Sequence, residues 1–348
     1  MQFMAQNSFA KDWLTNLKFG NVTDFVHPFY DSSDSLSSSG IIEWRDGKGL
    51  SVCFGRDIRK VVCLTGQCRI VHVWLFWDGA GNYLGFEEHP DDPLTKTDHT
   101  VFSAADKQKL HRILADSLSI LENLKQEDLI IKPENNETKV DAVSRATQPS
   151  LQEYLVRNAA YTCYTLWHTV YGNTRKEVLR ILEKRADQEY LKLIFDKNDP
   201  AYLRWAVDFI RRHSNYHADL YPQIIELIKG KNETVSGQAL AYFLKDRLSD
   251  VGLQKELIRS FEDFSYQRKF ELLWKLSEIQ NIDDEVILHL LDLFEREQIN
   301  ASLLGYAYKL VRKKNLQNPQ IDKKIRAQIN HSNLYVRNIT QKLITELQ

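Results

Sequence analysis

The sequence predicts two regions of different fold class, an α+β domain followed by an all-α array of helical repeats. Ten of the 14 glycines and five of the seven tryptophans lie at or before Gly172. Glycine suits turns and tryptophan suits strands, whereas the sequence after Gly172 shows helical periodicity at a regular spacing. We therefore predict an N-terminal extension over residues 1–39, an α+β domain over 40–172 and a helical repeat domain over 173–348.

Composition restricts the classes of function. The 348 residues include 46 basic and 47 acidic side chains, and 43% are hydrophobic. These values are typical of globular proteins, and they argue against disorder and against nucleic-acid binding driven by a basic excess. No apolar run reaches the roughly 18–20 residues of a transmembrane segment. Residues up to Gly172 carry 17 basic and 22 acidic groups and the rest carry 29 and 25, so the helical region could face an acidic partner.

The helical region repeats with a period of about 34 residues. Five similar segments begin at Ala201, Val235, Gln267, Ala301 and Tyr335, so their starts are 34, 32, 34 and 34 residues apart. Each follows a second amphipathic run and a polar turn, and a helix pair of this length must stack on its neighbours to bury its apolar face. The tetratricopeptide pattern is missing, whereas turns such as residues 199–204 resemble the HEAT pattern. We predict about five degenerate HEAT-like repeats that dock a protein partner.

The N-terminal region reads as short strands separated by glycine turns. The strands are expected at residues 40–49, 50–54, 58–64, 67–77 and 83–86. The fourth is apolar on both faces, which places it in the middle of a covered sheet. Residues 78–82 form a turn and residues 83–86 its hairpin partner. Ser103 is expected to cap a helix whose inner face carries Leu110, Ile113 and Leu114.

One segment of the N-terminal region has the residues of a phosphate site. Residues 147–149 place a hydroxyl and then a proline where an amphipathic run, 151–171, is expected to form a helix. The unpaired N–H groups and positive dipole of a helix start attract phosphate, and Arg145 would add positive charge. An ordinary capped helix start explains the same pattern.

The residues around this segment resemble a known family. Asp141, Ser144, Ala146 and Thr147 form the pattern Asp-x-x-Ser-x-Ala-Thr. It is similar to the flavinylation motif of FMN-binding domains in the C subunit of the sodium-translocating NADH:quinone reductase and the G subunit of the Rnf complex. The resemblance spans roughly residues 40–172. It implies an FMN cofactor esterified through its phosphate to Thr147, with Asp141, Ser144 and Ala146 in the recognised motif, and an electron-transfer function with a redox partner.

The sequence departs from that motif at Arg145, where the family has glycine. A glycine needed for close backbone approach or for positive φ is poorly replaced by arginine. The departure favours a second hypothesis, a non-catalytic interaction scaffold whose FMN-binding-like domain no longer holds flavin.

The resemblance also bears on localisation. Covalent FMN domains of this kind work outside the cytoplasm, so it implies an export signal upstream of Met1. Without one, we expect a cytoplasmic protein.

Several other residues are candidates for chemistry. Cys63, Cys68 and His72, with His89 and His99 nearby, could bind a metal, but their spacing matches no common zinc pattern, and core packing or a satisfied polar contact is favoured. Export would permit a disulfide between the two cysteines.

Polar and aromatic groups near the predicted hairpin are further candidates. The acidic and histidine groups at residues 87–92 and 98–100 could transfer a proton or bind a cation, but solvated loops are favoured. Aromatic side chains could stack on a flavin but are more typical of a sheet core; they are Trp74, Phe76, Trp77, Tyr83 and Phe86. Tyr161, Tyr164, Trp167 and His168 are expected to pack a helix against the sheet. No P-loop, Gly-x-Ser-x-Gly or His-Glu-x-x-His pattern supports a kinase or hydrolase.

Overall fold

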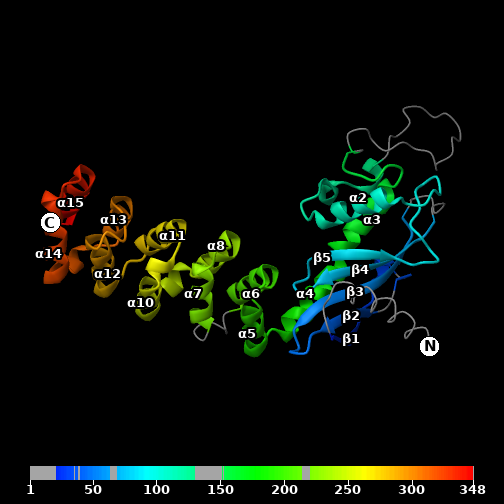
Figure 1. Ribbon diagram of the computed structural model, residues 1–348, viewed down its shortest axis with the longest axis horizontal. Coiled ribbons are helices and arrows are strands. Elements are labelled where there is room, and N and C mark those ends of the chain that lie inside the picture. Colours follow the sequence, from blue (N-terminus) through cyan, green and yellow to red (C-terminus); the bar gives the residue numbers. More distant parts are fainter. Residues whose placement is uncertain are drawn as a thin grey trace. The chain divides into compact units, whose positions relative to one another are not determined.

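The computed structural model describes residues 21–34, 36–37, 40–62, 69–129, 151, 153–213 and 220–347. The chain divides into two compact units, residues 1–197 and 198–348. The first holds an antiparallel sheet with helices and the second is helical (Figure 1), which confirms the predicted order of an α+β region followed by helices. The helices over residues 173–197 belong to the first unit, although we assigned them to the repeats.

The sheet of the first unit is a five-stranded meander in which every strand pairs with its neighbour in sequence. Its order is β1-β2-β3-β4-β5 and all four pairings are antiparallel. The strands are β1 (Thr23–Pro28), β2 (Gly40–Arg45), β3 (Ser51–Lys60), β4 (Val71–Asp78) and β5 (Tyr83–Glu88). Strand β4 lies between two neighbours, as its apolar faces predict, and the hairpin to β5 turns through residues 78–82.

Two features of the sheet differ from the prediction. Strand β1 lies within the predicted extension 1–39 and pairs with β2 from Pro28↔Gly40 to Thr23↔Arg45. The two strands expected at 50–54 and 58–64 are one continuous strand, β3. Gly55 lies inside this strand and does not form a turn. A Cβ added there would lie 2.8 Å from the Trp44 ring. That glycine admits a close side-chain approach rather than a turn.

The helices of the first unit cover one face of this sheet. They are α2 (Ala104–Ala115), α3 (Ala160–Val170), α4 (Asn173–Arg185) and α5 (Gln188–Lys197), with short 3-10 turns η1 (Ser32–Asp34), η2 (Ile120–Asn123) and η3 (Gln126–Leu129). Trp77 Nε1 donates to the Val170 carbonyl oxygen at 3.0 Å, and the Arg56 guanidinium donates to the Thr174 hydroxyl at 2.9 Å. The opposite face carries a buried apolar cluster that includes Trp44, Trp74 and Phe76.

Helix α2 begins as predicted. The Ser103 hydroxyl accepts a hydrogen bond from the Asp106 N–H, and the Asp106 side chain accepts one from the Ser103 N–H, which completes a capping box. Leu110, Ile113 and Leu114 are buried on its inner face.

Helix α3 begins later than predicted. The expected helix at 151–171 starts only at Ala160, because the chain turns through residues 153–159 and Asn158 has a φ of 58°. A left-handed residue interrupts a right-handed helix, and the Asn158 carbonyl oxygen instead accepts a hydrogen bond from the Thr97 N–H.

The helices of the second unit follow the predicted period. Its helices are α6 (Pro200–Arg212), α7 (Tyr221–Lys229), α8 (Glu233–Tyr242), α9 (Lys245–Leu248), α10 (Val251–Arg259), α11 (Tyr266–Ser277), α12 (Asp284–Glu295), α13 (Ala301–Tyr308), α14 (Pro319–Ala327) and α15 (Leu334–Leu347). The shorter 3-10 turns are η7 (Phe261–Asp263), η8 (Lys313–Gln317) and η9 (Gln328–Asn330). The five predicted segments coincide closely with α6, α8, α11, α13 and α15.

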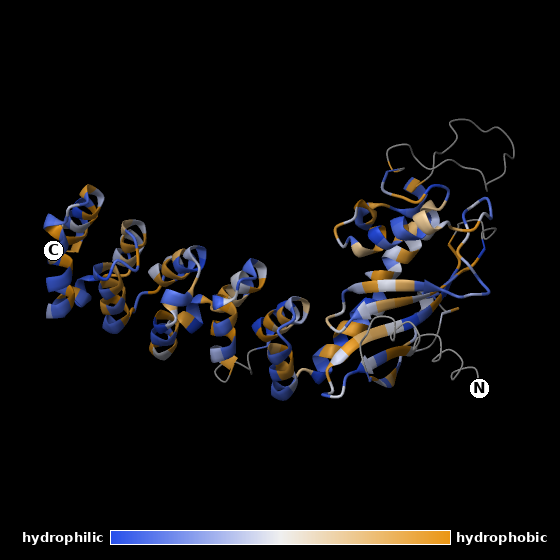
Figure 2. Cartoon of the chain, in the orientation of Figure 1, coloured by the Kyte–Doolittle hydropathy of each residue, from blue (hydrophilic) through white to orange (hydrophobic). Residues whose placement is uncertain are grey.

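Packing within the second unit links equivalent helices of successive pairs. Helix α6 packs on α8, α8 on α11, α11 on α13 and α13 on α15, while α10 packs on α12 and α12 on α14. Figure 2 shows that the longer helices carry hydrophobic residues on one side and hydrophilic residues on another. Among the described residues, no helix has the length and apolar character that crossing a bilayer requires.

Candidate functional site

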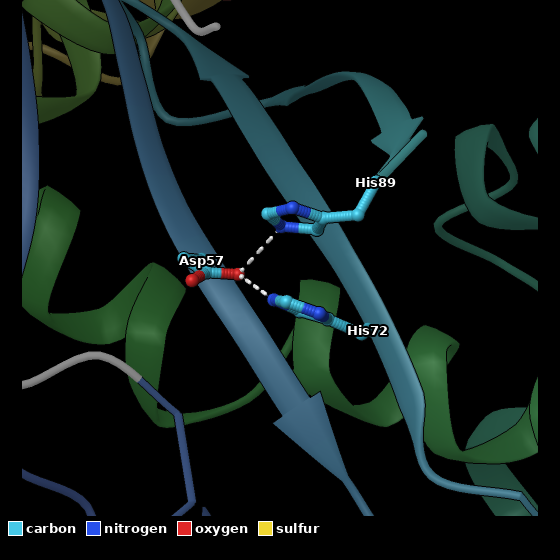
Figure 3. Close-up of side chains that lie close together, drawn as sticks. All are labelled: Asp57, His72 and His89. Atoms are coloured by element: carbon cyan, nitrogen blue, oxygen red, sulfur yellow. Dashed lines mark hydrogen bonds and ion pairs between the residues drawn. The ribbon is translucent and has the colours of Figure 1, made fainter. Parts of the chain in front are cut away.

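Three polar side chains from three neighbouring segments of the sheet converge on one point (Figure 3). Asp57 lies on β3, His72 on β4 and His89 directly after β5. Nε2 of His72 lies 3.0 Å from Asp57 Oδ1, and Nε2 of His89 lies 3.2 Å from the same oxygen. The two imidazole rings stack with their centroids 3.5 Å apart. We call these three residues the Asp-His-His cluster.

The register of the sheet explains why the cluster forms. Asp57 lies opposite Trp74, and Arg59 lies opposite His72, so Asp57 and His72 share one face and are diagonal neighbours. Backbone pairing between His89 and Asp92 turns the chain back immediately after β5 and holds His89 over the same face.

The cluster holds a buried negative charge. Asp57 is 3% exposed, whereas the side chains of His72 and His89 are 15% and 20% exposed. Burial raises the pKa of Asp57, but hydrogen bonds from the two histidines outweigh it and lower the pKa to about 2. The carboxylate is therefore ionised at neutral pH and acts only as an acceptor, and the histidines leave the cluster partly open to solvent.

A second carboxylate lies near the other ring nitrogen of His72. Nδ1 of His72 lies 3.5 Å from Asp92 Oδ2, and the other Asp92 oxygen accepts from the Arg69 guanidinium at 2.9 Å. Both ring nitrogens of His72 thus face carboxylates.

A separate network surrounds Glu43 on the face that the helices cover. Glu43 is fully buried and accepts hydrogen bonds from His27, Arg45, Ser51 and Arg185. Burial raises the pKa of Glu43, but these partners lower it well below its usual range. Because every polar contact is to a group of the protein itself, the arrangement ties α4 to the sheet rather than offering a site for a ligand.

A cavity of about 760 Å³ lies between β5 and α2. Its lining combines apolar Leu84 and Phe86 with charged Glu87, Lys107 and Arg112. Burial, followed by the charge of Glu88, raises the pKa of Glu87. The volume falls in the range of small-molecule sites.

The predicted flavin residues are not among those described. Asp141, Ser144, Arg145, Ala146 and Thr147 lie outside the described ranges, as do Cys63 and Cys68. The first α-helix described after the motif, α3, begins at Ala160 with no side-chain cap. The argument that a helix running from residue 151 supplies a phosphate site at Thr147 is therefore not supported by α3.

The remaining candidates divide between core packing and the cluster. Trp74, Phe76 and Trp77 are buried in the sheet core, as predicted. Trp167 and His168 donate to or face the carbonyl oxygens of Asp116 and Leu121 in the chain after α2. The buried Cys163 is no candidate nucleophile, because burial raises the pKa of its thiol to about 12.

The structure brings two of the candidate histidines together. His72 makes a satisfied polar contact, which is one of its two predicted roles, whereas His89, predicted in a solvated loop, also contacts Asp57. His99 is not part of the cluster; it lies in an exposed turn where Asp98 accepts hydrogen bonds from Thr100, as predicted for a solvated loop.

Sequence reasoning missed Asp57 altogether. The available signal was a charged pair, Arg56–Asp57, in the middle of an otherwise buried strand, where charged residues occur only if they are paired.

Comparison with known proteins adds no relative. No family model matches this chain, and no curated protein or solved structure matches it.

Proposed function

We propose that this protein is an FMN-binding electron-transfer protein whose helical region docks a protein partner. The observation that carries the proposal is the sequence motif Asp141-x-x-Ser144-x-Ala146-Thr147. The fold of the first unit, an antiparallel sheet with helices, agrees with the α+β class that the resemblance implies. The isoalloxazine ring would supply the redox chemistry, and the protein would bind, orient and shield it.

The cavity between β5 and α2 supports noncovalent retention of a cofactor in the same unit. Its apolar wall, Leu84 and Phe86, suits a planar ring, and the cationic side chains of Lys107 and Arg112 suit a phosphate. Lys107 also pairs with Glu88 at 2.6 Å, which leaves Arg112 as the lining residue to test.

For the second unit we propose a solenoid of HEAT-like repeats. The supporting observations are the period of about 34 residues and the packing of each second helix, from α6 to α15, on the next. Polar side chains also link successive pairs. Arg268 on α11 pairs with Glu233 on α8 at 2.9 Å, and Asn315 donates to Asp284 on α12 at 2.7 Å. Repeat arrays of this kind present extended binding surfaces.

Co-expression with a flavin transferase in an exporting host tests the flavin assignment. We expect denatured wild-type protein to show in-gel flavin fluorescence and the added mass of FMN, and Thr147→Ala to show neither. Ser150→Ala is the matched hydroxyl control and is expected to keep the flavin. Unmodified wild-type protein would reject covalent attachment, and modified Thr147→Ala would reject the assigned residue.

Noncovalent binding is tested separately by titrating the purified chain with FMN and following flavin fluorescence. Arg112→Ala should weaken binding at least about tenfold if Arg112 meets the phosphate, a loss consistent with a charge-assisted hydrogen bond. Equal affinity of the two proteins would reject the cavity as the binding site.

The second candidate function is an interaction scaffold without flavin. Arg145 in the glycine position of the motif favours it, as do Tyr266 and Trp274 on α11, which are 53% and 51% exposed. Large aromatic side chains of this kind are common at protein interfaces. Cross-linking in the native host should recover one partner with the wild type and with Lys342→Ala, but not with Trp274→Ala. Recovery with all three would contradict a docking role for Trp274.

A further inference from the structure

We propose that the Asp-His-His cluster is a binding site for one divalent transition-metal ion, with Asp57 Oδ1 and Nε2 of His72 and His89 as ligands. The three atoms lie within 4.8 Å of one another, and Figure 3 shows both imidazoles directed at the same carboxylate. Neutral imidazole and carboxylate are the ligand types that Zn²⁺ and Fe²⁺ sites use.

The distances suit an ion at the point of convergence. Zn²⁺ binds nitrogen and oxygen at about 2.1 Å, so adjacent ligands of a tetrahedral site lie roughly 3.4 Å apart. Here the two oxygen-to-nitrogen separations are 3.0 and 3.2 Å. For these two separations an outward movement of a few tenths of an ångström reaches the tetrahedral value, and no strand has to shift by a residue.

The rings themselves must rotate. A metal ion lies in the plane of each imidazole that binds it, yet the two rings are stacked at an interplanar angle of 20°. Binding therefore requires the rings to tilt apart about the ion. Partial exposure of both side chains gives them room for this movement.

Metal binding changes which ring nitrogen carries a hydrogen. With the Asp57 carboxylate as acceptor, each histidine donates from Nε2. Metal binding needs the other tautomer, with the hydrogen on Nδ1 and a lone pair on Nε2. In His72 that hydrogen would point at Asp92 Oδ2, which lies 3.5 Å from Nδ1. Asp92 is in turn paired with Arg69. In many metal sites, a carboxylate that accepts a hydrogen bond from the other ring nitrogen fixes the orientation of a metal-binding histidine.

The type of site follows from the number of ligands. Three protein ligands leave at least one position for water or an anionic ligand, as in catalytic rather than structural zinc sites. The Asp57 charge offsets half of the charge on a divalent ion, and Asp92 offsets more. Two imidazoles exclude Mg²⁺ and Ca²⁺ as preferred occupants, because those ions favour oxygen ligands. The inference does not depend on flavin binding.

Metal titration of the full-length chain tests the proposal. Protein freed of metal with a chelator is titrated with Zn²⁺ by calorimetry and with Co²⁺ by visible absorption. We expect one ion per chain, d–d bands typical of four or five ligands, and a higher melting temperature with Zn²⁺, because a ligand that binds only the folded state stabilises it.

Variants assign the ligands. His72→Gln and His89→Gln keep a hydrogen-bond donor toward Asp57, and each should weaken Zn²⁺ binding on the order of a hundredfold or more. Asp92→Asn should weaken Zn²⁺ binding about tenfold, as expected for a group that contacts a metal ligand without binding the ion itself. His99→Asn is the matched control, because His99 is exposed, has a φ of 60° that asparagine tolerates, and is outside the cluster; it should bind as the wild type does.

Two results would overturn the proposal. The first is a wild-type chain with no stoichiometric Zn²⁺ or Co²⁺ binding, and the second is undiminished binding by both glutamine variants. If a variant fails to fold, X-ray absorption of the zinc-loaded wild type decides. Scattering from two imidazoles supports the assignment, and scattering from fewer than two rejects it.

Discussion

The two compact units bury polar groups in different ways. In the first unit, the charged side chains of Glu43, Arg56 and Asp57 are 0%, 1% and 3% exposed. In the described part of the second unit, the buried polar side chains are mostly neutral, such as Gln254 and Thr340, and the charged Arg268 is 7% exposed.

The difference indicates where chemistry is expected. A buried ionised group is costly and persists only when several partners hold it, so such groups concentrate at functional sites and structural networks. A buried neutral amide or hydroxyl satisfies backbone groups at lower cost, as Gln254 does between two helix pairs. The first unit therefore holds the candidate chemistry, and Gln254 of the second unit connects neighbouring helices.

Arg56→Ala in the first unit should lower the stability most. The Arg56 guanidinium donates to both Asp34 oxygens at 2.8 and 3.0 Å, and both side chains are almost fully buried. Removing one partner leaves Asp34 buried and unpaired, so we expect a loss of about 3–5 kcal/mol in the free energy of unfolding. Denaturant unfolding measures it, and Lys342→Ala, at an exposed pair, should change nothing measurable. A small loss at Arg56 would contradict the view that charged pairs hold the first unit together.

Gln254→Leu tests the corresponding feature of the second unit. The Gln254 amide donates to the Leu248 and Asn281 carbonyl oxygens at 2.8 and 3.0 Å and accepts from the Asp283 N–H. Leucine has a similar size but leaves these backbone groups without a hydrogen-bond partner. We therefore expect the free energy of unfolding to fall by about 1–3 kcal/mol. The exposed Gln267→Leu is the control. Equal stability of the two variants would show that the link between helix pairs contributes little.

Gly55→Ala probes the packing beside the Asp-His-His cluster. A Cβ at this position would lie 2.8 and 2.9 Å from the Trp44 ring and 3.0 Å from Phe76. Overpacking of this kind costs typically about 1–3 kcal/mol, which thermal unfolding would detect. Gly47→Ala, where a Cβ meets nothing within 4 Å, should leave the melting temperature nearly unchanged, and a similar fall in both variants would rule out the packing explanation.

A further effect that we expect is a dependence of stability on pH. The folded-state pKa of Glu43 lies below its unfolded value, because hydrogen bonds from His27, Arg45 and Ser51 and the charge of Arg185 outweigh burial. Its carboxylate therefore contributes stability above about pH 5, and this contribution is lost as the pH falls through the folded-state pKa.

Glu43→Gln should reduce the acid loss of stability as well as lowering stability at neutral pH. Denaturant unfolding at a series of pH values below about pH 5 measures the slope. Glu189→Gln, at a residue whose side chain is 83% exposed, serves as control and should keep the wild-type slope. An unchanged slope in Glu43→Gln would mean that other carboxylates dominate acid unfolding.

Local patterns predicted local structure well. The capping box at Ser103, the hairpin between β4 and β5 and the period of the second unit all follow from neighbouring residues. Strand β1 was missed because its pairing with β2 joins segments separated by a polar stretch. The late start of α3 was missed because left-handed Asn158 has no distinctive sequence signal.

The candidate site was only partly predictable. His72 and His89 were recognised as candidate metal ligands, but their common partner, Asp57, depends on the register of three strands. Register is set by side-chain packing across the whole sheet and not by the spacing of ligands in the sequence. The flavin motif remains a prediction from the sequence, because residues 141–147 lie outside the described ranges.

We propose that the chemistry of this protein resides in the first unit, at two independent sites. Joint flavin and metal analysis of the same purified samples, from cells that supply a flavin transferase and zinc, tests it most directly. The account predicts flavin and about one zinc ion per wild-type chain, zinc without covalent flavin in Thr147→Ala, and flavin without zinc in His72→Gln. Wild-type protein that carries neither group would contradict the account.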